Sequence, residues 1–213
     1  IIQELKGLLK TKNIGTDSVR ALLLDFQATL ETKPEKAIKL EKDALAQIEN
    51  ITADNARLVS NLHANLGGLY RMNGHPDLAR EHMEKSISLL DQFNLLHIND
   101  SIPQIANYAM FLTEQQEPER GISELQKLSG IIKEYHSNDC LDYAKVQETL
   151  GTIYLMTANL SQAKTHFKRA FKIYEKIWAD EPEMIEAKYQ EIQELYPQIG
   201  FCIGKNLSGL LTK

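Results

Sequence analysis

A proline recurs every 42 residues along the chain, at Pro34, Pro76 and Pro118. Each lies in a similar polar stretch, namely "TKPEKA", "GHPDLA" and "QEPERG", and "ANLSQA" follows after one more interval. A fixed period of this length indicates a chain built from copies of one supersecondary unit. The period therefore restricts the possible folds more strongly than any other feature of the sequence.

Apolar residues follow the same period on both sides of these turns. One column holds Leu24, Leu66, Tyr108, Leu150 and Ile192. Within each block the apolar positions lie three or four residues apart, as on one face of an α-helix, and no alternating strand pattern occurs. We therefore expect each repeat to be a helix A, a polar turn and a helix B. Proline would open helix B, where its missing N–H is tolerated, and Ser161 would cap the fourth helix B instead.

Small residues also recur, at positions where helix A and helix B would face each other. They are Gly67, Ala109 and Gly151 on helix A, and Ala37, Ala79, Gly121 and Ala163 on helix B. Small side chains allow two helix backbones to approach closely, and Met83 and Phe167 are expected to fill the space beside them. This pattern predicts packing and not an active site.

The columns "L-G-x-x-Y … A-x-x-x-[FM]-x-x-[AS]" are best preserved in "LGGLYRMNGHPDLAREHMEKSISLL" (66–90) and "LGTIYLMTANLSQAKTHFKRAFKIY" (150–174). They resemble the tetratricopeptide repeat (TPR), over about residues 17–196. The usual TPR has 34 residues, and the longer period is similar to that of kinesin light chains. The resemblance implies an all-α fold, an α-α superhelix in which antiparallel helix pairs form a TPR-like solenoid.

The whole chain, 1–213, is predicted to form a single TPR-like solenoid that is part of a longer protein. The expected repeats are 1–12 (the end of a preceding repeat), 17–50, 54–92, 101–136, 141–178 and 183–213. The last repeat carries Pro197, Gly200, Gly204 and Gly209 where its helix B belongs, so we expect a degenerate or capping unit.

Stacked helix pairs form a concave surface that binds extended peptides or partner helices. In kinesin light chain repeats, asparagines on helix A grip a peptide main chain, and the resemblance implies this role for Asn65 and Asn107, with Thr149 extending the row. The alternative is that both asparagines hydrogen-bond between adjacent helices A. Further peptide-groove candidates are Gly68, Arg71, Met72, Met110, Thr113, Lys145, Glu148, Thr152 and Met156. The Lys that begins the carboxylate clamp of chaperone-binding members is replaced by Leu22, Ala64, Ala106 and Glu148, so we expect no such clamp.

Charge and composition exclude several classes of protein. A formal net charge of -5 argues against direct nucleic-acid binding. No apolar run reaches the roughly 18 residues of a membrane span, and no secretion signal is present, so we expect a cytoplasmic protein that does not bind membranes. The stripe Lys164, Lys168, Lys172 and Lys176, with Arg169 beside it, would either attract an acidic partner or nucleic acid, or form a solvated helix face.

No motif of a known catalytic or metal site occurs. The six histidines have no metal-ligand spacing, and no phosphate-binding loop or nucleophile motif is present. We therefore expect no catalytic residues, no metal and no cofactor. The leading hypothesis is a scaffold that captures a protein or peptide segment. The alternatives are a sensory or regulatory module of a larger protein, similar to some bacterial transcription regulators, that binds a small signal, and a self-associating domain.

Overall fold

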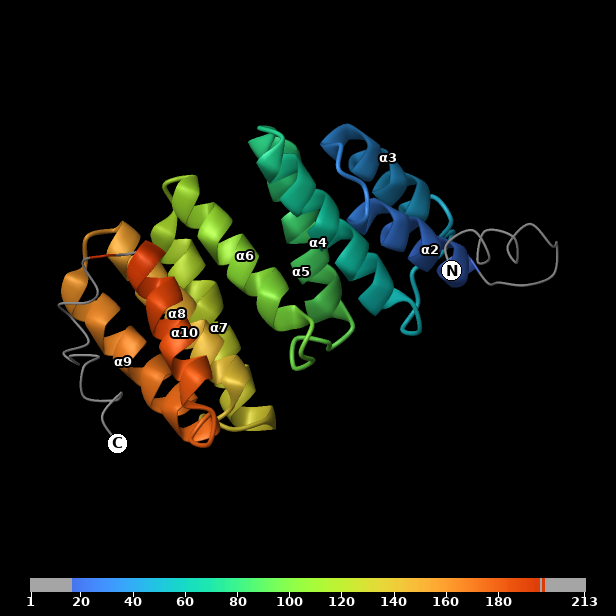
Figure 1. Cartoon of the computed structure of the whole chain (residues 1–213). Coiled ribbons are helices and arrows are strands. Elements are labelled where there is room, and N and C mark those ends of the chain that lie inside the picture. Colours follow the sequence, from blue (N-terminus) through green and yellow to red (C-terminus); the bar gives the residue numbers. More distant parts are fainter. Residues whose placement is uncertain (1–16, 196, 198–213) are drawn as a thin grey trace. The chain divides into compact units, whose positions relative to one another are not determined.

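The computed structural model describes residues 17–195 and 197, and this part of the chain is helical with no strand (Figure 1). The helices are α2 (Asp17–Thr29), α3 (Pro34–Leu45), α4 (Ala56–Met72), α5 (Pro76–Gln92), α6 (Ser101–Glu114), α7 (Pro118–Tyr135), α8 (Leu141–Met156), α9 (Leu160–Ile177) and α10 (Pro182–Leu195). Even-numbered helices are the predicted helices A, and odd-numbered ones are helices B. The all-α prediction is confirmed, whereas the expected repeat at 1–12 and most of the helix B after α10 lie outside the described residues. None of the described helices has the length and apolar character that crossing a membrane requires.

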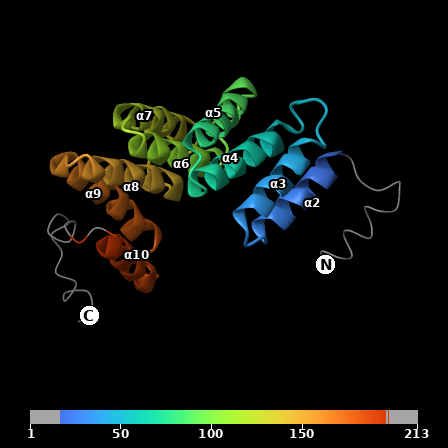
Figure 2. The same ribbon diagram turned by 90° about the horizontal axis from the view of Figure 1, so that it is seen from above.

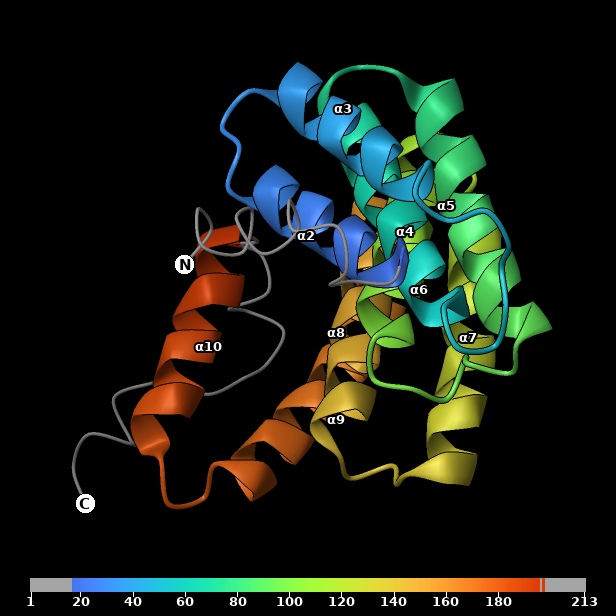
Figure 3. The ribbon, with the colours of Figure 1, turned by 90° about the vertical axis from the view of Figure 1, so that its right-hand side faces the viewer.

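The chain divides into two compact units between Tyr108 and Ala109, within α6. In the N-terminal unit, α2 packs on α3, α3 on α4, and α4 on α5 (Figure 1). In the C-terminal unit, α7 packs on α8 and α8 on α9, and the chain then turns back to form α10 (Figures 2 and 3). Neighbouring helices are thus antiparallel pairs within each unit, and a single solenoid across both units stays a prediction.

The repeated prolines open helices B as predicted. Pro34, Pro76 and Pro118 are the first residues of α3, α5 and α7. The prediction for the fourth repeat was wrong by two residues, because the N-cap of α9 is Asn159 and not Ser161. The Asn159 Oδ1 accepts a hydrogen bond from the backbone N–H of Gln162 at 3.3 Å and so satisfies one of the free donors at the helix start.

The turn from helix A to helix B is the same in three repeats. Gly74, Gln116 and Ala158 lie one period apart and have φ values of 75°, 66° and 58°. The residue after each of them donates its N–H to a carbonyl five residues earlier, as in the bond from His75 N to Tyr70 O of 2.9 Å. This is the Schellman end of a helix, which requires a left-handed residue and favours glycine. Only one of the three positions has glycine.

Small residues bring the paired helices together as predicted. A Cβ on Gly67 would lie 2.6 Å from Met83 Cγ, and one on Gly151 would lie 2.8 Å from the Phe167 ring. The third repeat reverses the arrangement, because its glycine is on helix B. A Cβ on Gly121 would lie 2.5 Å from the Ala109 carbonyl oxygen. Each of these pairs therefore has at least one helix without a side chain at the closest point.

Glycine at the two non-glycine turn positions should stabilise the protein. We expect Gln116→Gly and Ala158→Gly each to raise the free energy of unfolding by about 0.5 to 1 kcal/mol, because only glycine adopts this backbone conformation without strain. Gly74→Ala should lower it by about 1 kcal/mol. Urea unfolding measures all three variants. Gln126→Gly, at an exposed position within α7, is the control and should destabilise the protein by about 1 kcal/mol.

The close approach at Gly121 predicts a second pattern of stability. Gly121→Ala should lower the free energy of unfolding by about 1 to 3 kcal/mol, since its Cβ meets backbone that cannot move aside. Gly130→Ala is a matched control in the same helix, because a Cβ there meets nothing within 4 Å; it should stabilise the protein by about 0.5 to 1 kcal/mol. Equal effects of the two single alanine substitutions would contradict the packing account.

Candidate functional site: the helix A face

Exposed side chains gather on one side of the helices A in the N-terminal unit. On α4, Asn65, Gly68 and Met72 are spaced by three and four residues, so they share one face of the helix. The Met72 side chain is 81% exposed, and a Cβ on Gly68 would meet no atom within 4 Å. This part of α4 is therefore open surface that a ligand can approach.

The first helix adds apolar side chains that the sequence analysis did not select. Leu22 and Phe26 of α2, and Leu30 directly after it, are 50%, 47% and 57% exposed. Phe26 and Leu30 lie one period before Gly68 and Met72, so they occupy the same repeat positions. Aligning the first repeat with the second would have identified them. We define the helix A face as Leu22, Phe26, Leu30, Asn65, Gly68, Met72 and Asn107.

The two predicted asparagines have different surroundings. The Asn65 Nδ2 donates to Asp25 Oδ1 at 2.9 Å and to Glu41 Oε1 at 3.2 Å. Its amide group therefore joins α4 to α2 and α3, which is the interhelical alternative. Asn107 is exposed on α6, and its amide has no hydrogen-bond partner among the described residues. Asn107 thus keeps both its donor and its acceptor for a ligand, whereas Asn65 keeps only its carbonyl oxygen.

Glu41 is a buried acid next to this face. It is 1% exposed, and its Oε2 has no hydrogen-bond partner within the described part of the chain. Burial and the nearby Asp25 carboxylate raise the pKa of Glu41 to about 8, although the hydrogen bond from Asn65 opposes this. Glu41 occupies the repeat position of Met83, so the first repeat has a protonated acid where the second has an apolar side chain.

The threonine candidates use their hydroxyl protons within their own helices. Thr113, Thr149 and Thr152 donate to the carbonyl oxygens four residues earlier, at 2.9 to 3.1 Å. Each hydroxyl can therefore offer a ligand only its acceptor lone pairs. Thr113 is also only 7% exposed. It therefore faces the interior of its unit, whereas the sequence analysis expected it to line an open groove. Met110, like Arg71 on α4, is partly buried.

Glu148 connects three helices of the C-terminal unit. It accepts a hydrogen bond from the Tyr174 hydroxyl at 2.6 Å and forms an ion pair with Lys188 at 2.9 Å. Burial and the Glu148 charge raise the pKa of Tyr174, so its phenol stays protonated and remains a donor. Glu148 is thus engaged in the contact of α8 with α9 and α10, whereas the neighbouring candidates Lys145 and Met156 are exposed.

A small hollow lies beside this contact, with a volume of about 270 Å³. It is lined by Leu141, Lys145, Tyr174, Trp178, Met184, Ala187, Lys188 and Glu191. Tyr174 and Trp178 stack with their ring centroids 4.8 Å apart. Only Lys145 among its lining residues was expected to face a ligand.

Two histidines that look unrelated in the sequence are in contact. His63 Nδ1 lies 2.9 Å from His82 Nδ1, and the His82 ring stacks on Tyr70. Burial, together with the charges of His82 and Lys85, lowers the pKa of His63 to about 4. The spacing of the histidines along the chain does not predict this contact.

The same arrangement recurs two periods later. His166 lies 2.9 Å from Gln147 Oε1 and stacks on Tyr154. Recurrence at equivalent positions, with glutamine replacing one histidine, indicates a packing motif. The residues that the structure describes contain no group of three or more His, Cys, Asp or Glu side chains that would hold a metal ion.

Residues 101–176 match the family described as "Tetratricopeptide repeat". No curated protein matches the sequence significantly. The expected resemblance to this family is thus confirmed.

Solved structures of similar proteins agree on the fold. The chain superposes on BtubC (BKLC) from P. vanneervenii with a TM-score of 0.67 and 19% identity, covering 82% of this chain and 70% of that one. A "Podosopora anserina putative kinesin light chain" with nearly identical TPR-like repeats gives a TM-score of 0.68 at 13% identity, with 84% and 87% covered. MamA gives 0.56 at 16% identity, with 82% and 87% covered. The fold is therefore a TPR-like solenoid of antiparallel helix pairs.

Substitution of Glu41 should change how stability depends on pH. The pKa of Glu41 is about 8 in the folded protein and near 4.5 when exposed. Its contribution to the free energy of unfolding is therefore complete below pH 4.5 and is lost as pH rises through 8. Glu41→Gln removes this loss, and its new amide can donate to Asp25. We expect the variant to exceed the parent in free energy of unfolding by about 1 to 2 kcal/mol near pH 8.

Urea unfolding at pH 5, 6.5 and 8 measures this difference, which should grow with pH. Asp43→Asn removes a carboxylate from an exposed position of the same helix and serves as the control. If both variants differ from the parent by an amount that is independent of pH, Glu41 is not protonated in the folded state.

Proposed function

We propose that the chain is a scaffold that captures an extended segment of a partner protein on the helix A face. Tetratricopeptide repeats are in general protein-interaction scaffolds, and proteins that contain them are generally non-enzymatic. The particular surface and the type of segment are our proposal. Absence of catalysis and a cytoplasmic location stay predictions.

The observation that carries this proposal is the group of exposed apolar side chains on α2 and at its C-terminal end, next to an unfilled position on α4. Leu22, Phe26 and Leu30 are each about half exposed, and no atom lies within 4 Å of a Cβ built on Gly68. Exposed apolar side chains that cluster are typical of interaction surfaces. The bulky residues of α2 offer contact area, and the glycine leaves room for a ligand side chain. We therefore expect a ligand with apolar residues.

The asparagines would hold the ligand main chain. Asn107 offers an N–H donor and a carbonyl acceptor to the same peptide, and Asn65 offers its carbonyl oxygen. A main chain bound in this way can vary in sequence, because its hydrogen bonds do not depend on side chains. Selection among ligands then comes from Arg71 and Met72 on α4.

Peptides selected by phage display against the chain provide the ligand for a direct test. Isothermal titration calorimetry then compares Phe26→Ser and Asn107→Asp with two matched controls on helices B. Leu78→Ser removes an exposed apolar side chain from α5, and Gln126→Glu changes an exposed amide to an acid on α7. Both test variants should weaken binding by about tenfold or more, because each removes contacts worth at least about 1.4 kcal/mol.

The affinities of the two control variants for the peptide should stay within about twofold of the parent's affinity. Circular dichroism confirms that every variant is folded. Equal losses in test and control variants would place the binding surface away from the helix A face. Loss in Phe26→Ser alone would retain the apolar surface and remove the asparagine from the mechanism.

A further inference from the structure

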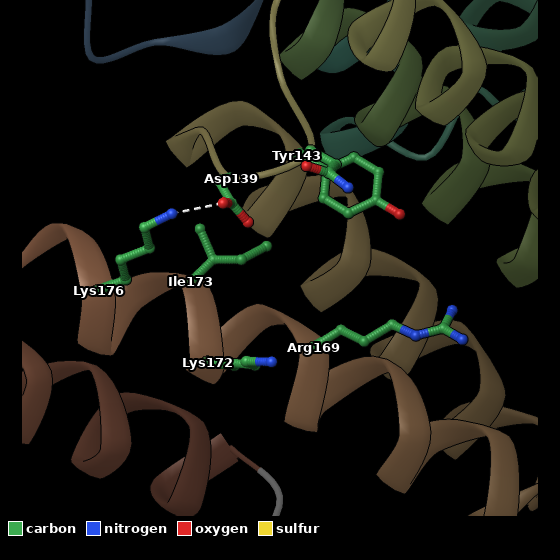
Figure 4. Close-up of a pocket in the computed structure, with 7 residues that line it drawn as sticks. Asp139, Tyr143, Arg169, Lys172, Ile173 and Lys176 are labelled. Carbon is green, nitrogen blue, oxygen red and sulfur yellow. Dashed lines mark hydrogen bonds and ion pairs between the residues drawn. The ribbon is translucent and has the colours of Figure 1, made fainter.

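A second hollow, on the side of helix B, has a different chemical character. It has a volume of about 620 Å³ and lies between the loop before α8 and the exposed side of α9 (Figure 4). Its lining residues are Asn138, Asp139, Tyr143, Arg169, Lys172, Ile173 and Lys176. All of them belong to the C-terminal unit. Its size is within the range that small-molecule sites occupy.

Positive charge dominates the lining. Arg169 and Lys172 extend from adjacent turns of α9, and neither forms an ion pair with a carboxylate among the described residues (Figure 4). Lys176 is paired with Asp139, which is the one acid in the lining. Lys133, whose Nζ lies 5.3 Å from the centroid of the Tyr143 ring, adds a further positive charge close by. Two cations are therefore available to an anion.

The inner surface of the hollow is apolar and aromatic. Tyr143 and Ile173 are 8% and 6% exposed, so they are fixed by packing and do not need to be ordered by a ligand. An apolar ligand body can contact the small part of these two side chains that is exposed. The hollow thus combines two available cations with a rigid aromatic and aliphatic surface.

The structure also separates two sets of cations that form one stripe in the sequence. Lys164 and Lys168 are exposed and do not line the hollow, so they follow the solvated-face alternative. Arg169, Lys172 and Lys176 face the loop that contains Asn138 and Asp139. Periodicity within α9 could not distinguish these sets, because the loop that defines the hollow precedes α8.

We propose that this hollow binds a phosphate monoester carried on an aromatic or apolar body. A phosphate monoester has a charge of about -1.5 to -2 near pH 7, which matches two unpaired cations. The Arg169 guanidinium can donate two parallel hydrogen bonds to its oxygens, and the body packs on Tyr143 and Ile173. The site is independent of the helix A face. Its ligand is either a phosphorylated side chain of a partner or a free phosphorylated small molecule, and the second case corresponds to the sensory alternative.

Phenyl phosphate is the first probe, with inorganic phosphate and phenol as its two separate parts. Binding is followed in the full chain by ¹H–¹⁵N NMR titration at constant ionic strength. The test variant is Arg169→Gln, Lys172→Gln. The control is Lys164→Gln, Lys168→Gln, which removes the same charge from exposed positions of the same helix. All four residues are exposed, so both variants should fold, and circular dichroism verifies this.

We expect phenyl phosphate to bind more tightly than inorganic phosphate and phenol. The test variant should lose at least about tenfold in affinity, whereas the control stays within about twofold. Affinity should also fall as pH decreases below about 6, where the phosphate gains a proton. No binding at millimolar phenyl phosphate, or equal losses in the two variants, would overturn the proposal.

Two further probes distinguish the sources of the ligand. A short phosphotyrosine peptide that binds more tightly than phenyl phosphate indicates a phosphorylated partner segment, and equal affinity indicates a free small molecule. Both results support the site. A single-stranded oligonucleotide that binds more tightly than both, with equal losses in the two variants, would indicate a nonspecific polyanion surface and would contradict the proposal.

Discussion

The structure depends on the close backbone contact between helix A and helix B of each pair. Where Gly67 meets Met83, or Gly121 meets the Ala109 carbonyl, no room exists for another side-chain atom. Dense packing of this kind fixes how two helices lie on each other. It also decides which side of each helix A faces outward. The exposed positions of Asn65, Gly68 and Met72 on α4 follow from it.

Much of the fold was predictable because it is local and repeated. The period places Pro34, Pro76 and Pro118 at helix starts, and the structure confirms each of them. The error at the fourth helix B has a simple reason: Asn159 and Ser161 are both good capping residues two positions apart, and a helix start is rarely predictable to within one residue. The reversed glycine of the third repeat was also visible, since Ala109 and Gly121 appear in the columns of small residues.

The candidate site was less predictable, because its contacts join residues from different helices. Nothing local indicates that Asn65 reaches Asp25 and Glu41, or that His63 meets His82. Thr113 was misplaced for a reason that alignment could have shown. The equivalent residue one repeat later is Leu155, which is 8% exposed, so this repeat position points inward.

The N-terminal unit contains a buried acid and a partly buried histidine whose protonation has opposite effects on its stability. Burial raises the pKa of Glu41 to about 8, so rising pH forces a charge into the interior. The pKa of His63 is lowered to about 4, so falling pH does the same from the other side, beginning near pH 6.5 where an exposed histidine takes up its proton. Between about pH 4.5 and 6.5 the two slopes oppose each other. Mild acidification therefore changes the stability of the N-terminal unit little. Above about pH 6.5 only the effect of Glu41 remains. Alkaline conditions thus weaken the unit that carries the helix A face.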